Sequence, residues 1–398
     1  MNTKTVNKFL EEHKRRQSCL IHKKRTHDVV GIEIKSKRKE YKMTLEALAG
    51  RSCSQSYLSK IENNKISPNL DILEEICIKS HLTKEDIDRL IKSGLMLEDA
   101  MNSYIYHDLD FIKAKVDEFN YSNYRTDILK LIYYVSIEQY NVAQEIFDKV
   151  IEYVSSLPEV DFIIFSIISG FLLIHSYRFE EAIKSVESLD SYMLTEELEV
   201  ARLLVLFKAS FALNTVDCIE YYRDLEAYFI TNLEVSMLEE LRYYICLYFL
   251  KNNSSNQYFK YLRGIKDEKY TSSLNTINCF MNNKFEYIKA SYDKLLPFAE
   301  MLRKIANDRR SYLSIVKNKT DLFYHLDYDP LFVNYFVCKE PQEKIDYIFE
   351  KVLPILVKSN DNYLKSFYIN ELSNLDHPKR SSHLMKFIMA FNNEKSVK

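Results

Sequence analysis

The chain has 398 residues and is 46% apolar and 28% charged, which is typical of a folded globular protein with room for about two or three domains. Five glycines and seven prolines are too few for a sheet-rich fold or for an α/β fold with glycine-marked loops, so we expect an all-α protein. The net charge of −2 is unevenly spread, because residues 1–66 sum to +9 and the remainder to −11. A basic stretch is often only a solvated surface, but this end of the chain also suits a polyanion.

Cysteine usage and hydropathy indicate a cytoplasmic protein. The seven cysteines are scattered and form no C-x-x-C pair, which is typical of reduced, buried thiols and excludes a disulfide framework. The N-terminus has no apolar segment that would make it a secretory signal. The longest apolar run, residues 162–174, is too short to span a bilayer and is predicted to be a buried helix, so we expect no membrane partner.

Residues 1–28 form a basic N-terminal extension that contains eight Lys or Arg and three His. Two interpretations are open. The extension forms a basic arm along DNA, or it forms a solvated amphipathic helix built on Val6, Phe9 and Leu10.

Residues 30–77 divide into four short helices. Ile32 and Ile34 begin the first, and Thr44 is a suitable N-cap for the second, LEALA at 45–49. After Gly50, either Cys53 or Ser54 can cap a third helix, which buries Leu58 and Ile61 and leaves its polar N-terminal end outward. A fourth helix is predicted over NLDILEEIC, residues 69–77.

The order of these residues resembles the helix-turn-helix of the Cro/cI-type (XRE) regulators. The elements that carry the resemblance are L-A at 48–49, S-Q-S-x-L-S-x-I-E at 54–62 and P-x-x-x-x-L from Pro68. The turn reads GRSCSQ, and its C-x-Q-S form is similar to that of the PlcR and NprR peptide-sensing regulators. Leu45 departs from the pattern, because many members have there a Gln near a DNA phosphate.

The resemblance implies that the third helix reads the major groove with its N-terminal end. Gln55 is the residue best suited to read a base, since its amide can pair with adenine N6 and N7. Serines and Lys60 would contact phosphates or base edges, while Arg38 and Lys65 would supply charge at the backbone. The full set of expected DNA-binding residues is Arg38, Thr44, Ser54, Gln55, Ser56, Tyr57, Ser59, Lys60, Asn64 and Lys65. The alternative is that these polar side chains are only solvated.

Beyond this segment the chain becomes acidic and helical throughout. Residues 83–94 are predicted to form a capped helix that stops at Gly94 and bridges two domains. We therefore divide the chain into the extension 1–28, a helix-turn-helix domain 29–82, a linker helix 83–110 and a helical repeat domain 111–398.

A weak repeat follows, in which small residues recur 36 to 39 positions apart, each with large apolar residues four and seven positions later. The small residues are Ala143, Ala182, Cys218 and Ser255, the residues at +4 are Phe147, Val186, Tyr222 and Phe259, and those at +7 are Val150, Leu189, Leu225 and Leu262. This pattern predicts an array of helical hairpins. The segment 175–189 resembles half of a tetratricopeptide repeat, and a plain helical bundle is the alternative.

A basic helix-turn-helix joined to such an array is the layout of the Rap, NprR, PlcR and PrgX family. The resemblance implies a right-handed superhelical array that binds a short signalling peptide and thereby alters DNA binding. Asparagine side chains on inner helices are the expected clamps for the peptide backbone. The candidates are Tyr177, Asn214, Tyr243, Tyr244, Asn278 and Asn334, each of which is also compatible with ordinary surface or core.

Enzyme motifs are absent from the sequence. It contains no G-x-x-x-x-G-K-[ST], H-E-x-x-H or G-x-S-x-G, so we expect neither an enzyme nor a cofactor. The run H-L-D-Y-D at 325–329 has metal-ligand residue types, but a solvated turn explains it better.

The main interpretation is a homodimeric, peptide-responsive regulator on palindromic double-stranded DNA, since symmetric half-sites need two reading helices. The alternatives are a repeat scaffold or anti-activator that binds a protein partner, and a Rap-like dual regulator that also acts on a response regulator.

Overall fold

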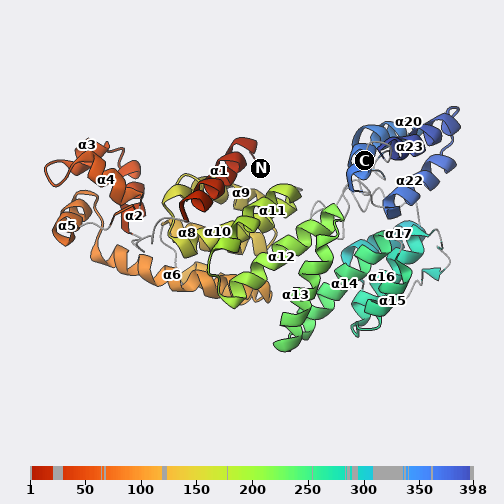
Figure 1. Ribbon diagram of the computed structural model, residues 1–398, viewed down its shortest axis with the longest axis horizontal. Helices are drawn as coiled ribbons and strands as arrows, with labels where there is room; N and C mark the ends of the chain where they lie inside the picture. The colour runs from red at the N-terminus through yellow and green to blue at the C-terminus, as the bar shows by residue number, and fades with distance from the viewer. Residues whose placement is uncertain are drawn as a thin grey trace. The chain divides into compact units, whose positions relative to one another are not determined.

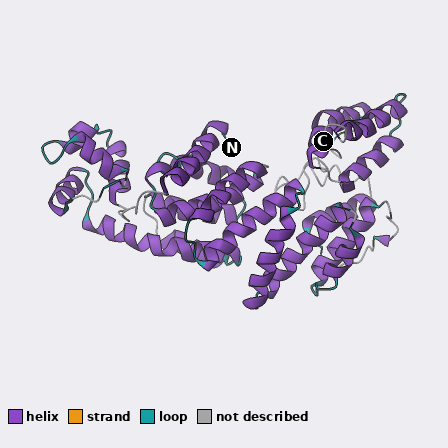
Figure 2. Cartoon of the chain, viewed as in Figure 1, coloured by secondary structure: helices purple, strands orange, loops and turns teal. Residues whose placement is uncertain are grey.

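The computed structural model describes residues 2–20, 30–63, 65–66, 69–118, 123–176, 178–252, 254–282, 284, 287–288, 295–307, 335, 338, 340–359 and 362–394. Within these residues the chain is all-α, as predicted, and it contains no strand (Figure 2). It divides into two compact units, Met1–Ala209 and Ser210–Lys398, and the division falls inside helix α12 (Glu196–Leu213). The finer domain boundaries predicted from the sequence stay predictions.

The first unit begins with an 18-residue helix and shorter helices, which helical hairpins follow (Figure 1). Before α12 its elements are α1 (Thr3–Leu20), α2 (Val30–Glu40), α3 (Leu45–Ala49), α4 (Gln55–Glu62), α5 (Leu70–Lys79), α6 (Lys84–Ile105), α7 (Leu109–Glu118), α8 (Tyr124–Ser136), α9 (Tyr140–Val150), the 3₁₀ turn η1 (Val154–Ser156), α10 (Glu159–His175), α11 (Phe179–Glu187) and the 3₁₀ turn η2 (Ser188–Ser191).

The second unit continues the alternation of helices and short connections. Its elements are α13 (Asp217–Thr231), α14 (Val235–Lys251), α15 (Ser255–Leu262), α16 (Glu268–Met281), α17 (Pro297–Asn307), α20 (Pro341–Tyr347), the π-helical segment η5 (Ile348–Val352), α21 (Leu353–Ser359), α22 (Asn362–Asn374) and α23 (Arg380–Glu394). None of the helices that the structure describes in either unit has the length and apolar character needed to cross a membrane.

Helix α6 begins where the sequence predicts and ends later. Thr83 caps it by a capping box, in which Thr83 Oγ1 accepts a hydrogen bond from the Asp86 amide and the Asp86 carboxylate accepts one from the Thr83 amide. The predicted stop at Gly94 is wrong, because α6 continues to Ile105. A glycine inside a helix costs only about 1 kcal/mol relative to alanine. Burial of Leu97 and Met101 beyond it offsets that cost.

The predicted repeat is confirmed in three copies. Its small residues lie in α9, α11 and α13, and their partners at +4 and +7 are fully buried in each. The fourth copy was placed one residue out of register, since Ser255 is exposed and Phe259 is 53% exposed, whereas Tyr258 is buried. Tyr258 follows Tyr222 by 36 positions, so the register continues through Tyr258. Two adjacent aromatic residues made the choice ambiguous in the sequence.

The apolar run 162–174 is a buried helix, as predicted. Helix α10 buries every residue from Asp161 to Ile174, so that other helices cover it on all sides. Gly170 lets α12 approach α10 closely, because a Cβ added there would lie 2.8 Å from Val205 Cγ1 of α12. That distance is shorter than a normal van der Waals contact, so the helices would have to separate to admit a side chain.

We expect Gly170→Leu to lower the free energy of unfolding of the first unit by about 1–3 kcal/mol, the usual cost of overpacking a core. The measurement is chemical denaturation of the full chain, followed by hydrogen exchange of α10 and α12. Lys184→Leu, which adds the same side chain at an exposed position of α11, is the control and should be nearly neutral. Equal stability of the two variants would contradict the close packing.

The N-terminal extension forms a helix over residues 3–20. Val6 and Phe9 are fully buried and Leu10 is half-buried, whereas Lys4, Lys8 and Lys14 are exposed. The amphipathic interpretation is therefore confirmed in its apolar residues, but the helix is docked rather than merely solvated, because α1 contacts η1, α11 and η2.

Candidate nucleic-acid interface

Helices α2–α5 pack around one small core. It consists of Val30, Ile34, Leu48, Ala49, Leu58, Ile61, Ile76, Cys77 and Leu82, with Leu45, Cys53 and Tyr57 among the half-buried residues against it. Leu58 and Ile61 lie three positions apart on α4 and turn one side of that helix inward, as the spacing predicts. The opposite side and the N-terminal end of α4 are left outward.

Local side-chain caps define where α3 and α4 begin. Thr44 Oγ1 accepts a hydrogen bond from the Ala47 amide at 3.1 Å, and Ser54 Oγ accepts one from the Tyr57 amide at the same distance. Of the two caps proposed from the sequence for α4, Ser54 is therefore the one used. Gly50 ends α3 with a φ of +51°, a backbone conformation that favours glycine.

The N-terminal end of α4 presents polar side chains to solvent. Ser54, Gln55 and Ser56 are exposed and consecutive, and Lys60 is exposed one turn further along. The unpaired amides at a helix N-terminus carry partial positive charge, so this end favours an anionic partner. The end of α4 thus combines donors for a phosphate with an amide side chain suited to a base edge.

The other predicted DNA-binding residues are placed less uniformly. Thr44 and Lys65 are exposed, although the hydroxyl of Thr44 is occupied as the α3 cap. Tyr57 and Ser59 are half-buried, and Tyr57 packs on the core. Asn64 lies outside the described residues.

Arg38 has a partner within the cluster that the sequence did not indicate. Its Nε and Nη2 donate to the two carboxylate oxygens of Glu62 at 2.6 and 2.8 Å, and its Nη1 donates to the Met43 carbonyl. The Glu62 side chain is only 2% exposed and that of Arg38 15% exposed. The fork therefore ties α2 to α4, and this use of the guanidinium differs from the predicted contact with the DNA backbone.

Leu45 and Cys53 have structural reasons for their identity. Both side chains are half-buried against the core. Leu45 therefore adds apolar contact to the core at a position where the predicted family pattern has a polar glutamine. Burial raises the pKa of the Cys53 thiol, which disfavours its thiolate form.

Four of the six predicted peptide-binding residues lie in the described part of the second unit. Tyr177 and Asn334 lie outside the described residues. Tyr243 and Tyr244 are buried in α14, where Tyr243 packs on Tyr270 and Tyr244 on Phe211, with ring centroids 5.4 and 5.3 Å apart. They therefore lie inside the second unit rather than along a surface.

Asparagines at the C-terminal ends of the alternate helices α12, α14 and α16 are hydrogen-bonded, and only some of them were predicted from the sequence. Asn214 follows α12, and its side-chain amide exchanges two hydrogen bonds with Asn252, the C-cap of α14, at 2.8 and 3.2 Å. The spacing of 38 residues, close to the repeat length, was the signal for Asn252. Asn278 lies in α16, where its carbonyl and side-chain oxygens accept hydrogen bonds from the Asn282 amide.

No candidate metal site is found in the described part of the chain, where no three His, Cys, Asp or Glu side chains lie close enough together to hold an ion. The run 325–329 lies outside the described residues.

Helices α2–α5 match a known protein family. The family described as Helix-turn-helix matches residues 34–79, which span most of α2 and all of α3–α5. Residues 34–79 are a helix-turn-helix domain. No curated protein matches the chain.

Two solved structures are similar to the chain at low sequence identity. One is Bacillus thuringiensis PlcR in complex with the peptide PapR7 and DNA, at 14% identity and a TM-score of 0.35, covering 66% of this chain and 99% of that chain. The other is the apo form of the competence regulator ComR from Streptococcus vestibularis, at 17% identity and a TM-score of 0.36, covering 63% of this chain and 96% of that chain.

Loss of the Arg38–Glu62 fork should destabilise the helix-turn-helix domain. Glu62→Gln leaves the guanidinium without its charged partner, and we expect a loss of about 1–3 kcal/mol, since Arg38 is partly exposed and water compensates in part. Hydrogen exchange of α2 and α4 in the full chain measures it. Glu74→Gln at an exposed position of α5 is the matched control. Unchanged exchange in both variants would show that the fork contributes nothing.

Glu33 gives the helix-turn-helix domain a pH dependence. Burial raises the pKa of Glu33 to about 7, with Lys37 opposing and Asp86 and Asp127 adding to the shift, and its Oε2 has no hydrogen-bond partner among the described residues. The folded state therefore holds a proton that the unfolded chain releases near the ordinary pKa of 4.5. The contribution of Glu33 to stability should be greatest below pH 4.5, fall between about pH 4.5 and 7, and level off above that.

Glu33→Gln should remove this fall. We expect the variant and the native chain to differ little at pH 5, and the variant to be more stable at pH 8 by about 3 kcal/mol. Chemical denaturation at the two pH values measures the difference. Glu46→Gln, at an exposed position of α3, should leave the pH profile unchanged. A variant that is destabilised equally at both pH values would contradict a protonated Glu33.

Proposed function

We propose that the chain is a cytoplasmic transcription regulator that binds double-stranded DNA through α4 and alters this binding when its helical repeats bind a short signalling peptide. The observation that carries the DNA-binding half is the exposed end of α4, where Ser54, Gln55 and Ser56 are consecutive and outward within the helix-turn-helix domain. The basic character of residues 1–66 supports the same partner.

The division of labour at the interface follows from side-chain chemistry. Gln55 offers a donor and an acceptor in the plane of one amide, which matches the N6 and N7 atoms of adenine in the major groove. Lys60 and Lys65 offer point charges, which attract phosphates of any sequence. Specificity should therefore depend on Gln55 and overall affinity on the lysines.

A homodimer is part of the proposal. One reading helix covers only a half-site, and two are needed for a palindromic operator with half-sites roughly 34 Å apart. Two-fold symmetry of the protein then matches that of the DNA.

The peptide half of the proposal rests on the resemblance of the GRSCSQ turn to peptide-sensing regulators and on the hairpins that follow it. Stacked helical hairpins expose continuous inner helix faces, and an extended peptide on such a face needs donors and acceptors for its backbone. Side-chain amides such as those of Asn214 and Asn252 carry both, and their mutual hydrogen bonds would have to open for them to bind a peptide.

Substitutions in α4 and just after it test the DNA-binding half. Gln55→Ala should lower the preference for the selected site over random duplex by about 1–3 kcal/mol, because it removes base contacts. Lys65→Ala should weaken binding to both duplexes alike and reduce the salt slope by about one. The site is first selected from a random duplex pool, and affinities are measured across a salt series.

Lys260→Ala, which removes one exposed positive charge from α15, is the matched control and should change neither quantity. The upstream region of the protein's own gene, assayed with and without candidate peptides from the neighbouring reading frame, tests the peptide half. Absence of DNA binding even at low salt would refute the DNA-binding proposal, since phosphate-driven affinity is greatest there. DNA binding that no candidate peptide changes would favour a regulator that senses a different ligand.

A further inference from the structure

Helix α1 lies in a groove of the first unit and presents one regular stripe to it. Val6, Phe9, His13 and Arg16 follow the three-four-three spacing of a single helix face, and all four are buried. Phe9 packs edge-on against Phe147 of α9 and Phe165 of α10, with ring centroids 5.6 Å apart in each pair. This is the way an amphipathic helix binds a hydrophobic groove, here within one chain.

His13, the third residue of the stripe, makes two hydrogen bonds to the rest of the first unit. Ser166 donates its proton to the Phe162 carbonyl, so its oxygen accepts from His13 Nε2 at 3.2 Å, and His13 Nδ1 is left to accept from Ser188 Oγ. Burial lowers the pKa of His13 to about 3, which keeps the imidazole neutral as this pattern requires. Apolar contacts hold α1 in place, and the two hydrogen bonds of His13 fix the rotation of α1 about its own axis.

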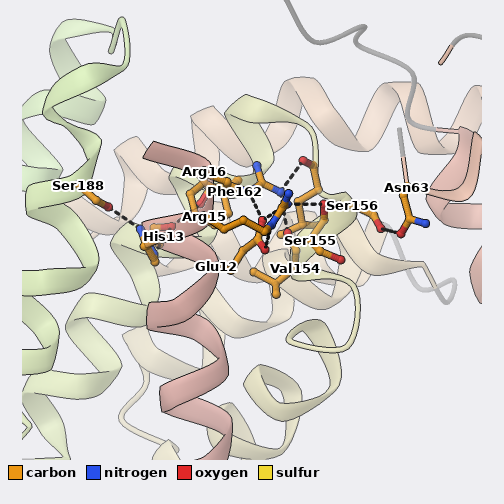
Figure 3. A network of polar contacts seen from close by, with 12 residues as sticks. Glu12, His13, Arg15, Arg16, Asn63, Val154, Ser155, Ser156, Phe162 and Ser188 are labelled. Atoms are coloured by element: carbon orange, nitrogen blue, oxygen red, sulfur yellow. Dashed lines mark hydrogen bonds and ion pairs between the residues drawn. The ribbon is translucent and has the colours of Figure 1, made fainter. Parts of the chain in front are cut away.

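Arg16 extends from α1 to the η1 turn. Its guanidinium stacks over the Phe162 ring, 3.9 Å from the centroid, and Nη2 donates to the carbonyls of Val154 and Leu157 at 2.6 and 3.0 Å. These two carbonyls lie on either side of Ser156. One buried side chain of α1 thus holds both flanks of η1 (Figure 3).

The helix-turn-helix domain contacts the same short turn from its other side. Ser156 Oγ donates to the side-chain oxygen of Asn63, the C-cap of α4, at 3.1 Å, and Lys35 Nζ donates to both of these atoms. Just before η1, Glu152 pairs with Lys39 of α2 at 3.1 Å. Figure 3 shows Ser156 between Arg16 and Asn63.

We propose that α1 is an intramolecular clamp, which holds η1 in the conformation that binds the helix-turn-helix domain. In the described part of the chain, the polar contacts of that domain with η1 and the residues just before it involve Ser156 and Glu152, and Lys39 Nζ also lies 5.0 Å from the centroid of the Tyr153 ring. A small displacement of the turn therefore breaks these contacts together. Arg16 is the main group that prevents this displacement, and Arg15 Nη2 adds a longer hydrogen bond of 3.5 Å to the Ser155 carbonyl. When α1 occupies its groove the reading helix is held against the hairpins, and when α1 leaves, the helix-turn-helix domain is released. The inference is independent of the identity of any peptide or operator.

The exposed Lys39–Glu152 pair allows a direct test in the full chain. Its nitrogen and oxygen atoms are 3.1 Å apart and the side chains are 40% and 58% exposed, so a carbodiimide can join them into an amide that mass spectrometry quantifies. Arg16→Met keeps an apolar stem over Phe162 and removes the hydrogen bonds of Arg16 to η1 and to Glu12, whose carboxylate stays paired with Arg15. We expect it to lower the yield of this cross-link at least threefold. Lys14→Met, which removes one positive charge from the exposed side of α1, should leave the yield unchanged.

A second cross-link separates release of the domain from loss of the fold. Lys149 and Asp127 join α9 to α8 within the hairpins at 2.8 Å, and their cross-link should form equally in every variant. Phe9→Ser is an independent way to empty the groove and should reproduce the effect of Arg16→Met. Equal Lys39–Glu152 yields in Arg16→Met and Lys14→Met, or a fall matched by the Lys149–Asp127 yield, would overturn the proposal.

Discussion

Burial of one side of α4 is the constraint on which the candidate interface depends. Leu58 and Ile61 pack into the small core of α2–α5, and Glu62, one residue further on, is held by the Arg38 fork. These contacts fix the rotation of α4 about its axis, so that Ser54, Gln55 and Ser56 face the solvent. A helix of eight residues has little stability of its own, so its direction is set by these tertiary contacts rather than by helix propensity. The polar end is therefore presented in one orientation.

Much of this arrangement could be predicted from the sequence because it is local. Caps such as Thr44, Ser54 and Thr83 act within three residues, and the spacing of Leu58 and Ile61 identifies the buried side without knowledge of the partner. The hairpin array follows for the same reason, since its small and large residues recur at the repeat length. Where local signals were degenerate, as with the adjacent aromatics Tyr258 and Phe259, the register was wrong by one residue.

What could not be predicted involves residues far apart in the chain. The pairing of Arg38 with Glu62, the contacts of Arg16 with Val154 and Leu157, and the meeting of Asn63 with Ser156 leave no spacing pattern. A charged residue in the sequence does not reveal whether its partner is solvent, DNA or a distant carboxylate. The basic residues at this end of the chain are accordingly of two kinds. Arg16 and Arg38 make contacts inside the protein, whereas Lys60 and Lys65 are exposed.

The central claim is that the N-terminal end of α4 lies against DNA, and site-specific photo-cross-linking tests it most directly. A photoreactive amino acid replaces the exposed Ser56 of α4 in one chain and the exposed Lys184 of α11 in another, and each is irradiated with bound duplex. The account predicts covalent protein–DNA adducts from position 56 and none from position 184. Adducts from position 184 alone, or from neither position while the duplex is bound, would contradict it.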